Sequence, residues 1–287
     1  MEIGVGLPAT IPGASGPLVL EWARRTDSAP FSSLGVIDRL VYTNHETLIS
    51  LAGAAAVTER VRLMTTVLIA PVRDAALLAK QAATIDAFSG GRLTLGLGVG
   101  ARDDDFRAAS ATFEDRGRRF EEQLDLMKRV WSGEPVGDGI GEIGPQPAQP
   151  GGPELLIGAY APAPLKRVGR WGDGFISGGI PDPSTVRQMY EVAEESWRAE
   201  GREGRPRFVA CMYYALGPDA ESGGDYIRDY YSYFGGADED MANSIPSSRE
   251  TVEGLIQGFA DAGADELICW PTIADLDQLD RLAELVG

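Results

Sequence analysis

The chain has few of the residues on which common active sites depend. Its 287 residues include one histidine, His45, and two cysteines, Cys211 and Cys269, so a zinc site of several histidines cannot form. Both cysteines stand in apolar, strand-like runs, which indicates reduced core residues rather than a disulfide. Neither a G-x-S-x-G elbow nor a G-x-x-x-x-G-K-[ST] loop occurs. We expect no metal.

Basic residues and long apolar runs are also scarce. Twenty-six Lys and Arg stand against 43 Asp and Glu, and the net charge of −17 repels nucleic acid and anionic membranes. No apolar stretch reaches the roughly eighteen residues that span a bilayer, and the chain starts directly in a strand-like run. The sequence therefore predicts a cytoplasmic protein that acts on a small molecule, with no nucleic acid and no membrane as partner.

Residues 61–100 carry the strongest structural signal. They read as an apolar strand at 62–68, a helix closed by Gly90 and Gly91, and a second apolar strand at 93–99. Strands that are apolar on both faces and joined by a helix are typical of parallel sheets. Active sites of such folds lie at the carboxyl ends of the strands, so chemistry is expected around 66–71 and 98–105.

Further strand and helix patterns alternate along the whole chain. The eight strand candidates are 3–7, 34–37, 62–68, 93–99, 155–158, 174–176, 208–213 and 266–269. Asn44 is expected to cap the helix after the second strand, and the spacing of Ser247 and Glu250 predicts a capping box. Eight alternating units predict one domain, 1–287, with the α/β fold of a (β/α)8 TIM barrel and insertion loops at its C-terminal face.

Two segments do not fit this repeat. Residues 133–153 are rich in glycine and proline without periodicity, which predicts a long connection. Residues 217–246 mix glycine and acidic residues with aromatic ones, and loops of this length are usually functional or disordered. The aromatic residues of the second segment are Tyr226, Tyr230, Tyr231, Tyr233 and Phe234. Because of them we expect an ordered lid.

Candidate ligand contacts follow the fourth strand. Gly98 and Gly100 allow either close packing at the strand end or a flat ring against exposed backbone. Arg102 is expected to face the site, whereas the acidic residues 103–105 point in different directions, which disfavours a metal. Residues 115–119 contain several arginines. A surface position is expected for them, and the alternative is that one of them contacts a cofactor.

A second candidate lies after the fifth strand, at Gly158, Ala159, Tyr160, Ala161 and Ala163. This loop leads into a helix expected near Leu165. The N-terminus of a helix often binds phosphate. An ordinary strand-to-helix connection would have the same sequence pattern. The basic residues Lys166, Arg167 and Arg170 follow it and would suit an anionic tail. Histidine is the side chain whose ordinary pKa lies near neutrality. His45 could therefore transfer protons, or it could simply occupy the first turn of a helix.

Nearly the whole chain resembles the bacterial-luciferase-like monooxygenase family, whose members use FMN or the deazaflavin coenzyme F-420. The resemblance is carried by IGVGLP, VIDRLVY, the whole stretch from VRLMTTVLIAP to GGRLTLGLGVG, and RDDDF. Further matches are RGRRFEEQLDLMKRVWSG, PELLIGAYAPAPLKRVGRWGDGFI and AGADELICWP. The resemblance implies a barrel with a flavin-type ring at its C-terminal mouth and, by analogy, a homodimer.

The resemblance also implies roles for particular residues. A bulge at Thr66 and Val67, often with a non-proline cis peptide, would support the ring, and residues 158–163 would hold the phosphate. Two departures stand out: this loop lacks the hydroxyls of many relatives, and Asp38 is followed by Arg39 where some deazaflavin-dependent members carry a catalytic histidine.

The sequence thus predicts an oxidoreductase that transfers a hydride between a deazaflavin and a small organic substrate. One alternative is an FMN-dependent monooxygenase that receives reduced flavin from a separate reductase and uses O2. A catalytically silent flavin-binding or interaction barrel is the alternative from another class, and a barrel that acts on a sugar phosphate without redox chemistry is a further one.

Overall fold

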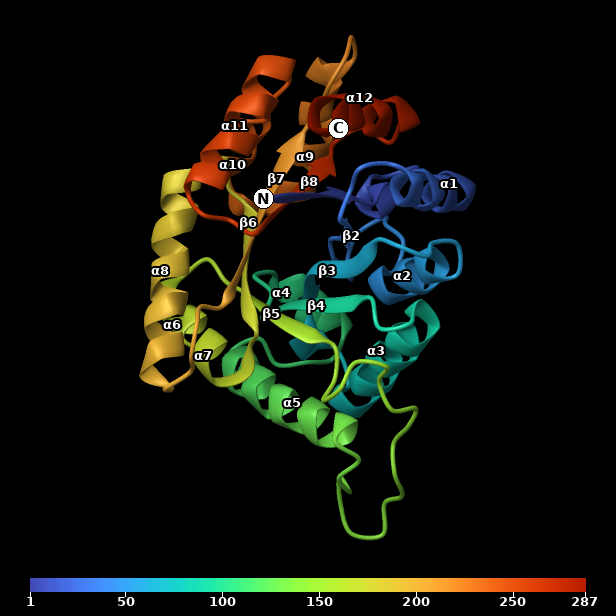
Figure 1. The fold of residues 1–287 in the computed structure, drawn as a ribbon, viewed down its shortest axis with the longest axis vertical. Coiled ribbons are helices and arrows are strands. Elements are labelled where there is room, and N and C mark those ends of the chain that lie inside the picture. The colour runs from blue at the N-terminus through green and yellow to red at the C-terminus, as the bar shows by residue number, and fades with distance from the viewer.

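Eight parallel strands close into a barrel in the order β1 to β8 (Figure 1). The computed structural model describes the backbone of residues 1–287 and all side chains except those of residues 234 and 237, so the predicted lid residue Phe234 lies outside the described side chains. The strands are β1 (Glu2–Gly6), β2 (Ser33–Val36), β3 (Arg62–Ile69), β4 (Leu93–Gly98), β5 (Glu154–Gly158), β6 (Gly174–Gly179), β7 (Arg207–Tyr214) and β8 (Glu266–Pro271). The predicted barrel is confirmed.

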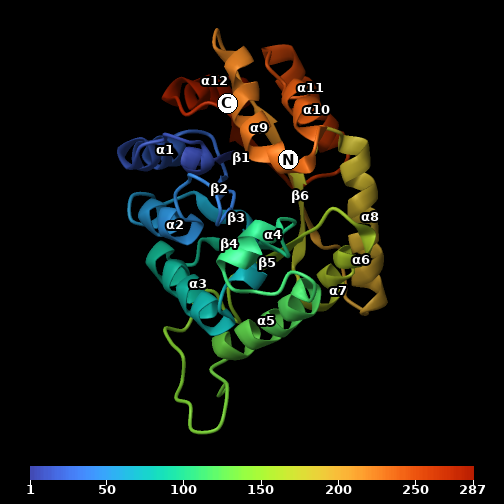
Figure 2. The ribbon, with the colours of Figure 1, turned by 180° about the vertical axis from the view of Figure 1, so that it is seen from behind.

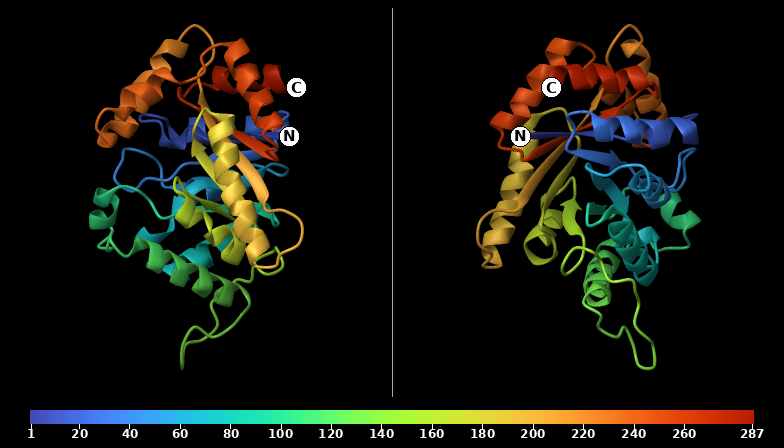
Figure 3. Two further views of the ribbon diagram at one scale, coloured as in Figure 1. Left: turned by 90° about the vertical axis from the view of Figure 1, so that its left-hand side faces the viewer. Right: turned by 45° about the vertical axis from the view of Figure 1, so that its right-hand side comes forward.

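Helices form a layer around the barrel (Figures 2 and 3). They are α1 (Gly16–Ser28), α2 (Thr47–Ala55), α3 (Ala75–Ser89), α4 (Asp103–Ala108), α5 (Arg116–Trp131), α6 (Pro162–Leu165), α7 (Arg167–Trp171), α8 (Pro183–Ala199), α9 (Gly223–Tyr231), α10 (Ala237–Asn243), α11 (Arg249–Asp261) and α12 (Leu276–Val286). Short 3-10 helices are η1 (Pro8–Thr10), η2 (Ala70–Val72), η3 (Ala220–Ser222) and η4 (Ser232–Phe234). Among the described residues no helix is long and apolar enough to cross a membrane.

The amino-terminal end of the barrel is filled by an ion network. Glu266 at the start of β8 is fully buried, and it accepts hydrogen bonds from Ser33 Oγ and Arg207 Nη2, both at 2.5 Å. Arg207 also pairs with Glu154, which accepts a further contact from Arg62 at 3.6 Å. A buried charge is tolerated only with such partners. These residues therefore form the floor of the barrel and leave its opposite end for ligands.

The carboxyl end of β3 departs from regular pairing. The register with β4 shifts between Thr65 and Leu68, and the peptide bond between Thr66 and Val67 is cis. Both features were implied by the sequence resemblance and are confirmed. Val67, at this irregular end of β3, lines a pocket.

Several predicted boundaries were wrong. Glu46, not Asn44, caps α2, because its carboxylate reaches the Ile49 N–H at 2.7 Å. The capping box of α11 begins one residue later than predicted, at Ser248, with Thr251 as its partner. Residues 217–246 form η3, α9, η4 and α10 rather than an irregular loop. Residues 133–153 contain no helix or strand, as predicted, and project from the body between α5 and β5 (Figure 1).

Candidate active site

A pocket of about 360 Å³ occupies the mouth of the barrel, at the carboxyl ends of the strands. The predicted cofactor residues that line it are Thr66, Val67, Gly98, Gly100, Arg102, Gly158, Ala159, Tyr160 and Ala161. Three segments far apart in the sequence thus converge at one cavity. Ala163 and Lys166 do not line it, and both are exposed on the outer side of the β5–α6 connection. Their predicted contact with a cofactor has no support in this geometry.

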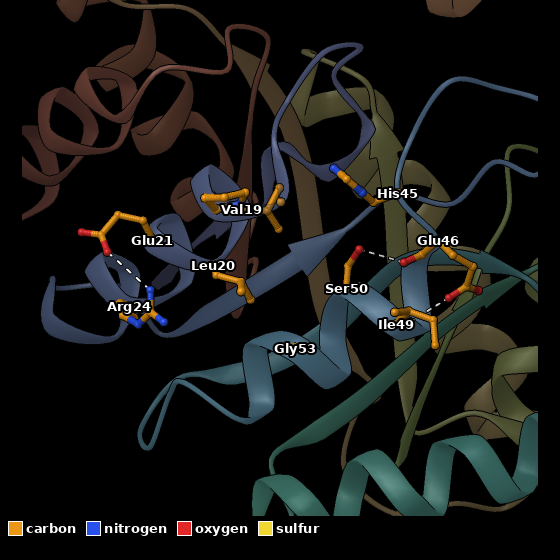
Figure 4. Close-up of a pocket in the computed structure, with 11 residues that line it drawn as sticks. Val19, Leu20, Glu21, Arg24, His45, Glu46, Ile49, Ser50 and Gly53 are labelled. Carbon is orange, nitrogen blue, oxygen red and sulfur yellow. Dashed lines mark hydrogen bonds and ion pairs between the residues drawn. The ribbon is translucent and has the colours of Figure 1, made fainter.

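His45 lies in a different hollow. This groove, of about 780 Å³, runs between α1 and α2 on the outside of the barrel (Figure 4). The His45 Nε2 atom hydrogen-bonds the Ala14 carbonyl oxygen at 2.8 Å. The groove is larger than the mouth pocket, but it opens away from the strand ends at which barrel enzymes place their chemistry. The structure therefore does not bring His45 to the other candidate site residues.

Val67 forms the centre of a flat wall in the mouth pocket. A Cβ at Gly98 would lie 2.9 Å from Val67 Cγ2, and a Cβ at Gly158 would lie 2.8 Å from Val67 Cγ1. The two glycines are thus required for close approach on either side of Val67. Trp270 Nε1 donates a hydrogen bond to Thr66 Oγ1 at 3.1 Å and fixes the other side of the cis peptide. The surface that Val67 forms with these two glycines is apolar.

Arg116, at the start of α5, brings a positive charge into the pocket. It makes no ion pair among the described side chains, and its Nε atom is buried without a hydrogen-bond acceptor. Its guanidinium lies over the Phe113 ring at 3.8 Å and donates to the Phe113 carbonyl at 2.8 Å. Of the arginines in residues 115–119, this one reaches the pocket, whereas the side chain of Arg118 is 66% exposed and paired with Asp115 and Glu122.

One of the three cations of the predicted basic island on α6 and α7 has an acidic partner in the described part of the chain. Arg167 pairs with Glu121 at 3.0 Å, and Arg170 lies over the Trp171 ring at 4.2 Å. The helix also begins earlier than predicted, at Pro162 rather than near Leu165. Because Pro162 and Pro164 have no N–H, this short first turn offers fewer backbone donors than an ordinary helix start. The donors of the loop are the N–H groups of residues 159–161.

Asp38 and Arg39, at the end of β2, are both held in place. Asp38 accepts from Arg73 at 2.7 and 3.0 Å, from Thr47 at 2.8 Å and from the Ile69 N–H at 2.9 Å. Arg39 is 6% exposed and pairs with the fully buried Asp105 at 3.6 Å. Asp105 in turn accepts from the backbone N–H groups of Leu40 and Val41, at 3.2 and 2.7 Å.

The acidic residues 103–105 form the first turn of α4, in which Asp103 is exposed and Asp105 is buried. Arg102 lines the pocket, as predicted, and is bonded to Asp104. The described residues contain no group of three acidic, histidine or cysteine side chains arranged to hold a metal ion.

Tyrosines from the lid segment, residues 217–246, cover one side of the pocket. Tyr230 and Tyr231 of α9 and Tyr233 of η4 line it. Tyr226 of the same helix donates to Thr10 at 3.1 Å and anchors α9 to the loop after β1. Burial raises the pKa of Tyr230 and Tyr231 well above the ordinary value, so these phenols stay protonated.

Sequence reasoning missed the residues that β7 and β8 contribute. Tyr213 and Trp270 line the pocket near the ends of these strands, with ring centroids 5.0 Å apart. Their signal in the sequence is an aromatic residue near the carboxyl end of a buried strand. That signal does not distinguish a core residue from a pocket residue until the register of the barrel is known.

The closed eight-stranded barrel and the pocket at its mouth are the arrangement of a TIM-barrel protein with a ligand site at the strand ends. Residues 1–268 match the luciferase-like monooxygenase family, and the chain belongs to that family. An uncharacterised protein of Mycobacterium tuberculosis is 32% identical over 169 residues, which cover 56% of this chain and 59% of that protein. The F420-dependent glucose-6-phosphate dehydrogenase of Nocardia farcinica is 30% identical over 190 residues, covering 62% of this chain and 52% of the enzyme. The aligned segment thus spans between half and three fifths of these relatives.

Solved structures confirm the fold. An F420-dependent secondary alcohol dehydrogenase in complex with an F420-acetone adduct has a TM-score of 0.80 at 19% identity, over 99% of this chain and 97% of that one. The oxygenating constituent of 3,6-diketocamphane monooxygenase from Pseudomonas putida, in complex with FMN, has a TM-score of 0.76 at 16% identity, over 100% and 96%. At these identities the likeness concerns architecture and does not choose between the two cofactors.

Proposed function

We propose that this protein binds a deazaflavin at the barrel mouth and transfers a hydride between it and a small organic substrate. The observation that carries the proposal is the apolar surface of Val67 between two glycines, in the same pocket as the cation Arg116. When bound, the deazaflavin supplies or receives the hydride, and the protein supplies position and exclusion of water. Val67 would support the ring, and the lid tyrosines would cover it.

The anionic tail would leave the pocket beside α5. Arg116 supplies a cation that has no carboxylate partner among the described side chains, and the N–H groups of residues 159–161 supply backbone donors. The start of α5 and the start of α7 are in contact, because Arg167 Nη2 donates to the Gly117 carbonyl at 3.4 Å. Arg116 is therefore close to the connection that follows β5. These residues fit a phosphate through a guanidinium and amides rather than through hydroxyls.

Two arguments favour the deazaflavin over FMN. Two curated relatives that match at 30% identity are F420-dependent glucose-6-phosphate dehydrogenases, from Nocardia farcinica and Amycolatopsis mediterranei. The loop at 158–163 also offers no serine or threonine hydroxyl to a phosphate. An FMN-dependent monooxygenase supplied by a flavin reductase is the second candidate, supported by the FMN-bound neighbour of the same fold. A homodimer and a cytoplasmic location stay predictions.

Titration of the purified protein with each cofactor tests the proposal. Trp270 lines the pocket, so quenching of tryptophan fluorescence reports binding, and calorimetry gives the affinity. We expect the deazaflavin to bind more tightly than FMN, and Arg116→Met to weaken binding by about tenfold through loss of a charge-assisted contact. Arg118→Met, on the exposed face of the same helix, is the matched control. Tighter binding of FMN would favour the FMN-dependent monooxygenase. If neither cofactor binds, the catalytically silent barrel is the remaining hypothesis.

A further inference from the structure

Two phenol groups meet at the boundary between the barrel and the lid. Tyr213 lies near the carboxyl end of β7, and Tyr231 is the last residue of α9. Their hydroxyl oxygens are 2.9 Å apart, and their rings are edge to face with centroids 6.2 Å apart. Each residue is 6% exposed, and both line the mouth pocket. This contact joins α9 to the barrel at the cavity itself.

The pair is connected to the wall on which we place the ring. Tyr213 packs against Trp270, and the Trp270 indole donates to Thr66 of the cis peptide. A Cβ at Gly179 would lie 2.7 Å from the Tyr213 ring, so this glycine is required for the position of the phenol. The Tyr213 hydroxyl is thus held rigidly on the side of the pocket next to the bulge.

Other groups in the pocket are poor proton donors. Both carboxylate oxygens of Asp38 are occupied as acceptors, in four hydrogen bonds of which two come from Arg73. Asp105 is fully buried beneath Arg39, and arginine does not give up its proton. The Ser177 hydroxyl donates to the Gly178 carbonyl and accepts from the Cys211 N–H. The hydroxyl pair is the better-placed source.

We propose that Tyr213, with Tyr231 behind it, is the proton donor to the oxygen of a carbonyl substrate. This rests on the proposed function, because a reduced deazaflavin is the reductant. As the hydride adds to the carbonyl carbon, the C=O π electrons move to oxygen, and the Tyr213 O–H bond breaks as its proton passes to that oxygen. Tyr231 then returns a proton to the Tyr213 oxygen and regains one from solvent. The product is an alcohol.

The environment of the pair keeps the Tyr213 hydroxyl available as a donor. When Tyr231 donates to the Tyr213 oxygen, the Tyr213 proton is left for a ligand. Burial raises the pKa of Tyr213 well above its ordinary value, with the neighbouring tyrosines adding to the effect. A phenol of this kind stays protonated, as a group that donates a hydrogen bond to a carbonyl oxygen must be. Because Tyr231 belongs to α9, the donor pair is complete only while the lid lies on the barrel.

Binding of acetophenone labelled with ¹³C at its carbonyl tests the donor without any turnover. A donated hydrogen bond polarises the C=O group, so its resonance moves downfield on saturation of the wild-type protein, with or without deazaflavin. We expect Tyr213→Phe to lose this shift and Tyr226→Phe to keep it, because the Tyr226 hydroxyl is used by Thr10 on the same lid helix. An unchanged shift in Tyr213→Phe overturns the proposal, as does absence of saturable binding in the wild type.

Kinetics of the reduced deazaflavin complex supply the second measurement. We expect Tyr213→Phe to lower kcat for ketone reduction by about 100-fold with little change in KM, and to abolish the solvent isotope effect. Tyr231→Phe should give a smaller loss. Equal kcat in Tyr213→Phe and Tyr226→Phe overturns the donor role. If the deazaflavin does not bind, the proposed function is wrong. The NMR experiment needs no cofactor, so it still tests the hydrogen bond from Tyr213 separately.

Discussion

Val67 shows how much of this site depends on single atoms. Its two γ-methyl groups fill the spaces that Cβ atoms on Gly98 and Gly158 would need. The sequence predicts that Thr66, Val67 and both glycines belong to one site, because each follows a buried strand of a parallel barrel. It cannot predict which atoms touch, since those contacts depend on the register shift in β3.

Gly98→Ala tests the wall directly. The added methyl lies 2.9 Å from Val67 Cγ2 and forces Val67 toward the ring, so we expect deazaflavin affinity to fall by about tenfold or more, measured by calorimetry. Gly254→Ala is the control, because its Cβ meets open space on the exposed side of α11. That change should leave affinity unchanged and raise stability by about 0.5 kcal/mol. Unaltered affinity in Gly98→Ala would remove Val67 from the site.

At the scale of elements, helix starts were predicted less well than strands. A strand that is buried on both faces is recognised by its continuous run of apolar residues. A helix cap depends on a single side chain, and several neighbouring residues are candidates for it. Asn44 and Glu46 can both accept from a helix N-terminus, but Asn44 instead donates to the carbonyls of Arg39 and His45. The lid helix α9 escaped prediction because its buried face is mostly tyrosine and glycine, with Ile227 as the aliphatic residue among them.

Helix α8 offers a test of capping with a pH dependence. Asp182 accepts from Ser184 and Thr185, and their hydroxyls and N–H groups lower its pKa from 3.8 to about 2. A carboxylate whose pKa is lower in the folded state stabilises above its unfolded pKa, and this contribution is lost as the pH falls from about 4 to 2.

We therefore expect Asp182→Ala to lower the free energy of unfolding by about 1 kcal/mol at pH 7, measured with urea, and by much less near pH 2. Glu195→Ala, on the exposed face of the same helix, is the matched control and should have little effect. An equal loss at both pH values would show that the Asp182 charge is not involved.

For the whole molecule, the floor of the barrel joins strands that are distant in sequence. Glu266 of β8 contacts Ser33 of β2 and Arg207 of β7, which in turn holds Glu154 of β5. None of these pairs is visible in the sequence, because charged residues at strand starts look like surface positions. Only closure of the barrel brings them together.

Removing Glu266 leaves the buried Ser33 without its acceptor and deprives Arg207 of one of its two carboxylate partners. We expect Glu266→Ala to lower the free energy of unfolding by about 3–5 kcal/mol, measured by urea denaturation. Glu253→Ala, an exposed residue of α11 paired with Arg249, should change it by less than about 1 kcal/mol. A loss of that small size for Glu266→Ala as well would mean that the floor is not a stabilising network.

The closed floor also governs the sequence of events in a catalytic cycle. With Glu266 and its partners at one end, ligands exchange through the mouth, beneath the tyrosines of α9 and η4. On the proposed function, the ring rests on Val67 and the substrate lies between the ring and these tyrosines. The cofactor must then arrive first and depart last. Substrate that enters the pocket before the cofactor blocks cofactor binding. We therefore expect a high substrate concentration to inhibit the enzyme.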